Sequence, residues 1–362
     1  MCTRIYNNFN PENKFLTTAR NMDWAEQMPT TIFVFKTNLD KPTEKIGLSE
    51  KDTDALHDNP LTWIARYDSV VNMVGVSAPY GASDGINSAG LVANLLYDSD
   101  ASYHRNDSAK YKQLDVLRWV QFVLDTCASV KEVVNQFNEN ATVQIEIIGA
   151  KVPGSTKEAS LHLAVSDKFG DSAIIEVHKG TFVIYHNMDF RIMTNEPSYA
   201  KQIELNQYWR WQWSSQNHFP SSTLPGGPFP SDRFARASYY LNHLHPTHSS
   251  ADSLAQSKSI VMNASVPVNF NSEDDNFPNI AQTLWTSVSD HNNLLYFFCN
   301  ARTMGDLYID LNELDRLTHP VSQLVVVDLK EGKFINKEFY GACYDKFEKA
   351  DDPFAVQAMT LA

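Results

Sequence analysis

The second residue of the chain, Cys2, is a candidate nucleophile because of its position. Met1 precedes a small residue, and we expect its removal to leave Cys2 with a free α-amino group. Such an amine has a reference pKa of about 7.7–8.0 and can accept the proton of a thiol, whose reference pKa is about 8.5. Nucleophile and general base would then come from one residue, and acyl transfer would proceed through a thioester. For Cys2 taken alone, the alternative is a frayed terminus with no chemical role.

Two charged residues stand where a hairpin would return them to Cys2. Residues 3–7 and 15–20 are rich in β-branched and aromatic side chains, and the turn-forming residues 8–13 between them predict a hairpin. Arg20 and Asp23 would then flank the thiol. A guanidinium stabilises a thiolate, and a carboxylate can orient the ammonium form of the terminus. Either residue, taken singly, could be an ordinary surface charge.

Further strands must frame this hairpin. Apolar and β-branched runs predict strands at residues 31–36, 70–76, 91–97, 161–166, 173–177, 181–186, 324–329 and 333–339. Residues 84–90 are expected to form a turn, Lys179-Gly180 a hairpin turn, and Glu331-Gly332 another.

Helical spacing of leucines predicts a helix between residues 111 and 137, and Ser129 with Glu132 resembles a capping box that opens a second one. A third helix is expected through residue 241, with its N-cap at Ser231-Asp232. Residues 207–230, rich in Trp, Pro, Ser and Gly, are expected to form an irregular loop that roofs a pocket. Strands connected by hairpins, with helices beside them, favour an α+β fold of antiparallel sheets.

Composition excludes several classes of protein. The 362 residues are 43% hydrophobic and 20% charged, which is typical of a globular chain and excludes collagen-like or disordered ones. The net charge of -13 opposes binding to nucleic acid or to an anionic membrane. The longest apolar runs, such as residues 294–299, are too short to span a bilayer, and we expect neither a transmembrane segment nor a signal peptide.

The other three cysteines, Cys127, Cys299 and Cys343, are too few and too scattered for a disulfide scaffold or a metal knuckle. Their apolar surroundings predict buried thiols. A histidine-rich segment at residues 243–248 suggests a metal, but its proline interrupts any helical ligand face and a surface connection is the better interpretation. No metal and no cofactor are therefore expected.

Several ordered motifs together resemble the choloylglycine hydrolase family, which contains penicillin V acylases and conjugated bile salt hydrolases. The resemblance extends from Cys2 to about Phe339. The motifs that carry it are Cys2, Arg20-Asn21-Met22-Asp23-Trp24, Asp84-Gly85-Ile86-Asn87 with Gly90-Leu91, Met193-Thr194-Asn195-Glu196-Pro197, Asp232-Arg233-Phe234-Ala235-Arg236-Ala237, Asn263-Ala264-Ser265-Val266-Pro267 and Pro278-Asn279-Ile280-Ala281.

The resemblance implies the four-layered αββα sandwich of the N-terminal nucleophile hydrolases, with residues 1–362 as a single domain. It implies that Cys2 is nucleophile and base, that Arg20 and Asp23 position it, and that the Asn195 amide contributes to an oxyanion hole. Arg233 would complete the polar set, and Tyr97 occupies a further oxyanion-hole position. Taken alone, Asn195 is typical of a turn, Arg233 of a helix surface and Tyr97 of a strand core.

The resemblance also narrows the substrate to a small-molecule acyl amide. Tyr97 favours penicillin V acylases, since bile salt hydrolases have Asn at this position. Residues 93–97, 171–176 and 231–240 resemble the Gram-negative branch, whose members also deacylate N-acyl homoserine lactones. An apolar acyl group needs apolar walls, and the candidates are Met22, Trp24, Tyr80, Leu95 and the residues from Trp209 to Trp213.

Two alternatives to this activity remain open: conjugated bile salt hydrolysis, and an inactive binding module of the same fold. The resemblance implies a homotetramer. We expect a periplasmic location if a leader is cut before Cys2, and a cytoplasmic one if Met1 is the native start.

Overall fold

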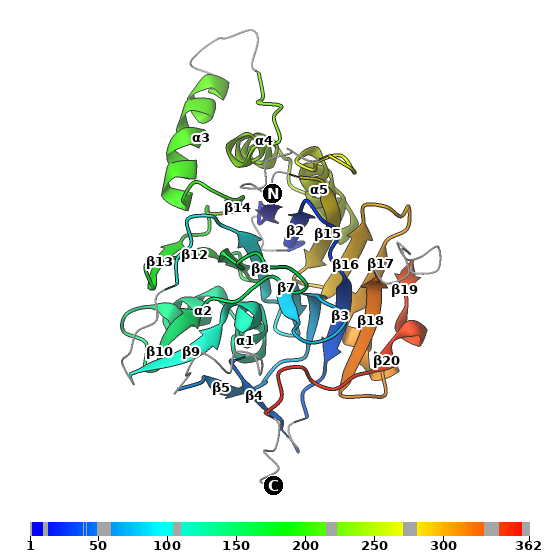
Figure 1. Cartoon of the computed structure of the whole chain (residues 1–362). Coiled ribbons are helices and arrows are strands. Elements are labelled where there is room, and N and C mark those ends of the chain that lie inside the picture. Colours follow the sequence, from blue (N-terminus) through cyan, green and yellow to red (C-terminus); the bar gives the residue numbers. More distant parts are fainter. Residues whose placement is uncertain are drawn as a thin grey trace.

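Two large sheets face each other at the centre of the molecule, and helices cover both outer faces (Figure 1). The structure is a computed structural model of the 362-residue chain. It describes residues 2–9, 14–38, 40, 42–48, 59–103, 110–214, 223–270, 281–328 and 340–356.

The first sheet carries the N-terminal hairpin near its centre. β1 (Cys2–Asn7) pairs antiparallel with β2 (Thr17–Asp23), so that Cys2 lies opposite Met22. Every residue of both strands is buried, because helices cover one face of the sheet and the second sheet covers the other. The described strands follow the order β14-β1-β2-β15-β16-β17-β19, the others being β14 (Ile192–Met193), β15 (Thr283–Asp290), β16 (Leu295–Asn300), β17 (Leu307–Asp310) and β19 (Gly341–Ala342).

The second sheet has the strand order β13-β12-β11-β8-β7-β6-β3-β18-β20 among the described residues. Its strands are β3 (Thr30–Phe35), β6 (Ser69–Val74), β7 (Gly81–Asn87), β8 (Val92–Tyr97), β11 (Leu161–Ser166), β12 (Ser172–His178), β13 (Thr181–His186), β18 (Val321–Val327) and β20 (Glu348–Lys349). Two short pairs lie outside it, β4 (Glu44–Ile46) with β5 (Thr62–Ile64) and β9 (Tyr111–Asp115) with β10 (Gln144–Ile148).

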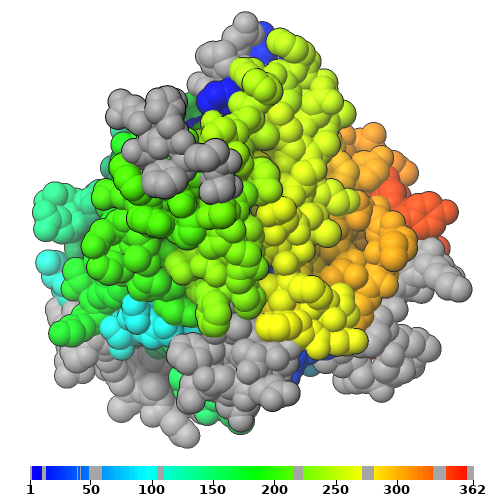
Figure 2. All heavy atoms as spheres, turned by 90° about the horizontal axis from the view of Figure 1, so that it is seen from above, coloured from blue at the N-terminus to red at the C-terminus, as the bar shows by residue number. Residues whose placement is uncertain are grey.

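The helices form the two outer layers. On the first sheet, α5 (Ser250–Asn263) packs against β1, β2 and β15, α4 (Pro230–Asn242) packs against β1, and α3 (Tyr199–Trp213) packs against α4. Figure 2 shows these three helices side by side, in green to yellow. On the second sheet lie α1 (Trp119–Thr126) and α2 (Val130–Phe137), and short 3₁₀ turns occupy Val116–Arg118, Leu311–Arg316 and Tyr344–Lys346. The predicted αββα sandwich is confirmed.

Buried polar side chains fix β1 against the second sheet. Arg4 donates hydrogen bonds to the hydroxyl of Ser172 and to the carbonyl of Val165, both at 3.3 Å. The Tyr6 hydroxyl donates to the carbonyl of Asp167 at 2.6 Å. Because unpaired polar groups are costly in a core, these bonds specify how the two sheets are placed relative to each other.

None of the helices in the described ranges combines the length and the apolar character that a membrane crossing requires.

Two predictions for residues 84–115 are wrong. Residues 84–87 belong to β7 and only residues 88–90 turn, because Gly85 packs so closely on β6 that a Cβ there would lie 2.4 Å from the Val70 carbonyl oxygen. Residues 111–115 form β9 rather than helix, since they pair in parallel with β10. The predicted capping bond is present, with the Glu132 amide donating to the Ser129 hydroxyl at 3.3 Å.

A third difference concerns the Trp-rich segment. Residues 207–213 continue α3 as helix instead of forming a loop, while residues 215–222 lie outside the described part. α4 starts at Pro230 after Phe229 rather than at a polar N-cap, which suits proline because the first turn needs no amide hydrogen bond. The strand predicted at 324–329 is β18, and the one at 333–339 lies outside the described residues.

Candidate active site

Cys2 is buried at the start of β1, with 1% of its surface exposed. Its Sγ lies 3.8 Å from Sδ of Met22, the residue opposite it on β2. Nη2 of Arg20 lies 4.0 Å from the same Sγ. Side chains two residues apart on a strand point the same way, so the register of β1 and β2 brings Arg20 and Met22 to the face that carries the thiol.

Asn195 and Arg233 hold the backbone of Cys2. The backbone nitrogen of Cys2 donates to Oδ1 of Asn195 at 2.6 Å, and Nη2 of Arg233 donates to the same oxygen at 2.8 Å. Nη1 of Arg233 donates to the carbonyl of Cys2 and, at 2.6 Å, to the hydroxyl of Thr3. Burial lowers the pKa of Arg233, whose guanidinium is completely enclosed. The guanidinium of Arg233, on α4, therefore holds both the start of β1 and the side-chain amide of Asn195.

The predicted oxyanion donor, Asn195, also contacts Tyr97. Its Nδ2 donates to the carbonyl of Tyr97 at 2.6 Å, so the last residue of β8 orients the amide. An amide nitrogen carries two hydrogens, and among the described residues only this carbonyl accepts one of them, which leaves the second for a developing oxyanion. The Tyr97 ring packs edge to face on Trp24 with ring centroids 5.5 Å apart.

Arg20 is held by an ion pair that sequence reasoning missed. Its Nη1 lies 2.8 Å from Oδ2 of Asp84, and its Nη2 donates to the carbonyl of Leu95 at 2.9 Å. The Tyr296 hydroxyl donates to Oδ1 of Asp84 at 2.6 Å, and all three side chains are buried. The sequence does contain a signal, because Asp84 opens one of the motifs that carry the family resemblance, although the local pattern there predicts a turn.

Asp23 ends β2 beside the strand start that carries Cys2. Its Oδ1 accepts a hydrogen bond from the Thr283 hydroxyl at 2.6 Å, across the β2–β15 pairing. Burial raises the pKa of Asp23, and the positive charges of the chain terminus and Arg233 partly offset this effect. Thr283 carries no signal in the sequence that connects it with position 23.

An apolar pocket opens at the thiol. It contains about 520 Å³ of space between atoms, its open mouth included. Of the predicted walls, Met22, Trp24 and Leu95 line it, together with Tyr97, Cys2 and Arg20. Further lining residues that the sequence did not reveal are Met28, Val74, Gly81, Ala82, Ser83, Leu117, Val152, Pro153, Ala159 and Leu161. Such a lining can desolvate an apolar acyl group beside the nucleophile.

Two predicted walls lie elsewhere. Tyr80 packs edge to face on Phe33, 5.0 Å between ring centroids, and lines a separate cavity. Trp213 on α3 packs on Tyr239 of α4 at 4.9 Å, and Trp211 is 54% exposed. None of the tryptophans of α3 is among the residues that line the pocket.

This arrangement can support acyl transfer. A buried thiol stands at the end of an apolar pocket, beside an arginine and an amide that is held from both sides. A tetrahedral intermediate places negative charge on the former carbonyl oxygen, and preorganised donors stabilise that charge. Among the described residues that line the pocket there is no histidine.

Comparison with known proteins agrees with this geometry. Residues 2–321 match the family described as linear amide C–N hydrolases, choloylglycine hydrolase family. A penicillin V acylase of Pectobacterium atrosepticum is 34% identical over 332 residues, which cover 87% of this chain and 82% of that protein.

Solved structures extend the comparison. The penicillin V acylase from Agrobacterium tumefaciens superposes with a TM-score of 0.79 at 32% identity, covering 99% of this chain and 100% of that one. The C2A variant of a conjugated bile acid hydrolase from Clostridium perfringens shares the fold, with a TM-score of 0.68, 20% identity, and 86% and 93% of the two chains covered. The chain is an amidohydrolase and belongs to the choloylglycine hydrolase family of linear amide C–N hydrolases.

Proposed function

We propose that Cys2, once Met1 is removed, cleaves the linear amide of an acylated small molecule through a thioester. The observation that carries the proposal is the position of the Cys2 thiol, buried against an apolar pocket with Arg20 and the Asn195 amide beside it. The α-amine accepts the thiol proton, and sulfur attacks the amide carbon. The resulting ammonium protonates the leaving amine, which departs and leaves an acyl thioester on Cys2.

Water completes the cycle. The amine of Cys2 takes a proton from a water molecule, and the hydroxide formed attacks the thioester carbon. The second tetrahedral intermediate collapses and releases the carboxylic acid, while the ammonium of Cys2 returns its proton to the departing sulfur and regenerates the thiol and the free amine. Asn195 Nδ2 stabilises the oxyanion in both steps, and Arg20 stabilises the thiolate as nucleophile and as leaving group.

The substrate that the pocket suits best is penicillin V, whose acyl group is an aromatic ether. Trp24 and Tyr97 stand edge to face at the pocket and can pack on an aromatic ring. The penicillin V acylases of Pectobacterium and Agrobacterium at 34% and 32% identity support the same choice. Phenoxyacetic acid and 6-aminopenicillanic acid would be the products.

N-acyl homoserine lactones are a second candidate substrate class. Part of the pocket lining is aliphatic or thioether, with Met22, Met28, Val74 and Leu161, and such side chains accommodate a flexible acyl chain. Both substrates carry an apolar acyl group on an amide next to a small ring. Turnover of penicillin V, a long-chain acyl homoserine lactone and glycocholate by one preparation distinguishes the choices, and preference for glycocholate would favour bile salt hydrolysis instead.

The mechanism predicts that Cys2→Ser loses turnover by at least about 10³-fold while keeping the fold, since a hydroxyl is much less readily ionised than a thiol. The measurement is steady-state hydrolysis of penicillin V beside a circular dichroism spectrum. Asn195→Ala should lose about 10²–10³-fold in kcat. Full turnover by a folded Cys2→Ser variant would contradict the mechanism.

Two measurements test the free amine and the intermediate. N-terminal mass analysis of active protein should show a chain that begins at Cys2, and active protein that retains Met1 would exclude the amine as base. Rapid mixing with substrate should show a burst of product equal to the concentration of thiol. A folded chain with neither burst nor turnover on any acyl amide would instead be a binding module.

A further inference from the structure

Three buried acidic and basic side chains converge beside the candidate site, and two of them directly follow residues that line the pocket. Asp98 follows Tyr97 at the end of β8, His162 follows Leu161 on β11, and Glu176 lies on β12. Asp98 and His162 do not line the pocket although each directly follows a residue that does, because side chains alternate along a strand. The three residues are at most 2% exposed.

Their chelating atoms face one another. His162 Nδ1 lies 3.8 Å from Asp98 Oδ2 and 4.0 Å from Glu176 Oε1, and the three atoms all lie within 4.8 Å of each other. His162 Nε2 is 2.9 Å from the carbonyl of Thr194 and must carry its hydrogen to make that bond. In neutral His162, Nδ1 therefore presents a lone pair to two carboxylates.

Two of these atoms have no hydrogen-bond partner among the described residues. Within the described part of the chain, neither Asp98 Oδ2 nor His162 Nδ1 makes a hydrogen bond. The distances of 3.8 and 4.0 Å exceed the roughly 2.7–3.2 Å that an N–H···O bond requires. Three buried acceptors that face one another repel, and the arrangement calls for a positive charge between them.

We propose that Asp98, His162 and Glu176 bind a divalent transition-metal cation, Zn²⁺ or Mn²⁺. Such a cation binds imidazole nitrogen and carboxylate oxygen at about 2.0–2.2 Å, so ligand atoms about 3–4 Å apart can share it after a small contraction. A mixed nitrogen and oxygen donor set selects these metals over Ca²⁺, which prefers oxygen alone.

The surrounding contacts resemble the outer shell of a metal site. A metal-bound histidine usually donates its second N–H to a carbonyl or carboxylate, as His162 does to Thr194. Glu176 is oriented by the Tyr199 amide at 2.5 Å on Oε1 and by His178 at 3.0 Å on Oε2. His178 is about one-third exposed and marks the side from which an ion can enter.

The cation would connect the strands that carry the candidate site. Thr194 precedes Asn195, and Asp98 follows Tyr97, whose carbonyl orients the Asn195 amide. Binding would therefore hold both sides of the expected oxyanion hole in place without contact with substrate. The competing arrangement is a proton on Nδ1 of His162, whose pKa is raised by the neighbouring Glu176 and Asp98.

Metal content and thermal unfolding test the proposal. The probe is full-length protein without a histidine tag, stripped with a chelator and then given Zn²⁺ or Mn²⁺ alone. We expect one equivalent of metal per chain by mass spectrometry and a melting temperature raised by on the order of 5 °C at saturation. Folded protein that binds under one-tenth of an equivalent, with no shift, would overturn the site and favour the protonated histidine.

Variants assign the site. His162→Gln and Asp98→Asn should lose the bound metal and the shift, whereas His243→Gln should keep both because His243 lies on the surface against Tyr239. Cys2→Ser should also keep both, which separates this site from a thiol site and from failure of the proposed hydrolysis. If the first two variants do not fold, Co²⁺ absorption of the wild-type protein decides: bands without thiolate charge transfer support the site, and a thiolate band contradicts it.

Discussion

The ion pair between Arg20 on β2 and Asp84 on β7 connects the first sheet to the second. Asp84→Asn should lower stability by about 3–5 kcal/mol, because it leaves a buried guanidinium without its counter-ion. The kcat/KM for penicillin V should also fall, since Arg20 then loses its orientation near the thiol. Chemical denaturation and steady-state kinetics measure the two effects.

A matched control for that prediction is Tyr296→Phe. It removes the hydroxyl that donates to Asp84 Oδ1 but leaves the ion pair intact. Its cost should be about 1.5–3 kcal/mol, typical of one hydrogen bond to a charged group. Equal losses in the two variants would show that the charge of Asp84 is not what positions Arg20.

Asp23 gives a prediction with a defined sign. Burial raises the pKa of Asp23 above its ordinary 3.8, so the folded state keeps a proton that the unfolded state releases. The resulting stabilisation is complete below pH 3.8 and is lost as the pH rises through the raised pKa. Asp23→Asn should therefore be more stable than the wild type at pH 7 and less active, as thermal melts and penicillin V turnover would show. A variant that is both less stable and fully active would refute this trade between stability and function.

Contacts between residues could be predicted from the sequence only where the two residues lie close together along the chain. Arg20 and Met22 could be placed beside Cys2 because a short hairpin fixes their register. Asp84 and Thr283 could not be assigned as partners, since they lie 64 and 260 residues from Arg20 and Asp23 and meet them only through sheet pairing and packing. The local sequence pattern carries no information about such pairs. Only the family motif that begins at Asp84 marks one of these residues as important.

At the scale of elements, His291 links the end of β15 to the turn before β8. Its Nδ1 donates to the carbonyl of Gly90 and its Nε2 accepts from the Thr18 hydroxyl, both at 2.8 Å. Burial lowers the pKa of His291 to about 4 from its ordinary 6.5, so the folded state holds it neutral. Its contribution to stability is complete above pH 6.5 and is lost as the pH falls toward 4.

The expected loss between those pH values is roughly 3 kcal/mol, at about 1.4 kcal/mol per pKa unit. His291→Gln should flatten this part of the pH–stability profile while lowering stability at pH 8. The exposed His319→Gln serves as the control and should leave the profile unchanged. Urea unfolding at half-unit pH intervals provides the measurement, and an unaltered slope in His291→Gln would reject the assignment.

The sequence predicts a helix or strand correctly where hydrophobic spacing and turn-forming residues agree. It predicts wrongly where these two signals indicate different structures. The strands of β11 to β13 follow from alternating apolar residues and the Lys179-Gly180 turn, in which both residues have positive φ. The prolines that follow residue 213 favour a loop for the whole segment, although tryptophan, tyrosine and arginine at 208–213 do not oppose the helix that the structure shows there. Asp, Gly and Asn predict a turn at residues 84–90, but these residues also occur where backbones pack closely, as residues 84–87 of β7 do.

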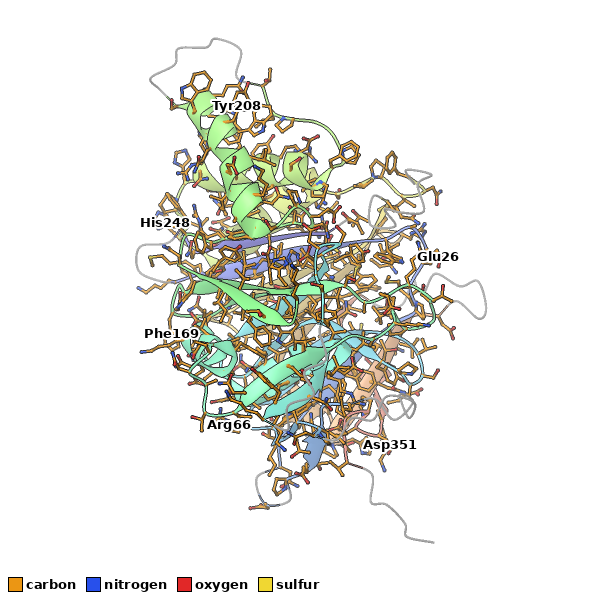
Figure 3. All side chains as sticks on the ribbon, turned by 60° about the vertical axis from the view of Figure 1, so that its left-hand side comes forward. Glu26, Arg66, Phe169, Tyr208, His248 and Asp351 are labelled. Carbon is orange, nitrogen blue, oxygen red and sulfur yellow. The ribbon has the colours of Figure 1, made fainter. Side chains whose placement is uncertain are left out.

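At the scale of the whole molecule, α3 rises from the body of the protein and carries Tyr208 near its upper end (Figure 3). Tyr208 and Trp211 are 56% and 54% exposed, which leaves two large aromatic surfaces on one helix. We propose that they contribute to the homotetramer that the family resemblance implies. Light scattering should give a mass of four 40.9-kDa chains, and Trp211→Ala should weaken the assembly.

Met304→Ala provides the control for that prediction, because Met304 is fully exposed far from α3 in the sequence and should have no effect on mass. A monomer at every concentration would contradict the proposal. The four layers themselves could be predicted from the family resemblance, whereas strand order could not be predicted from the pattern alone, because neighbours such as β2 and β15 are separated by most of the chain.

The candidate site draws its parts from almost the full length of the chain: Cys2 comes first, and Asn195, Arg233 and Thr283 follow in turn. β2 finds its partner β15 only when residues 283–290 exist. During translation, the proposed nucleophile is therefore made before the residues that would position it. A nascent chain that ends before residue 195 lacks the expected oxyanion donor, so we expect hydrolysis to begin only after the larger part of the chain has been made and folded.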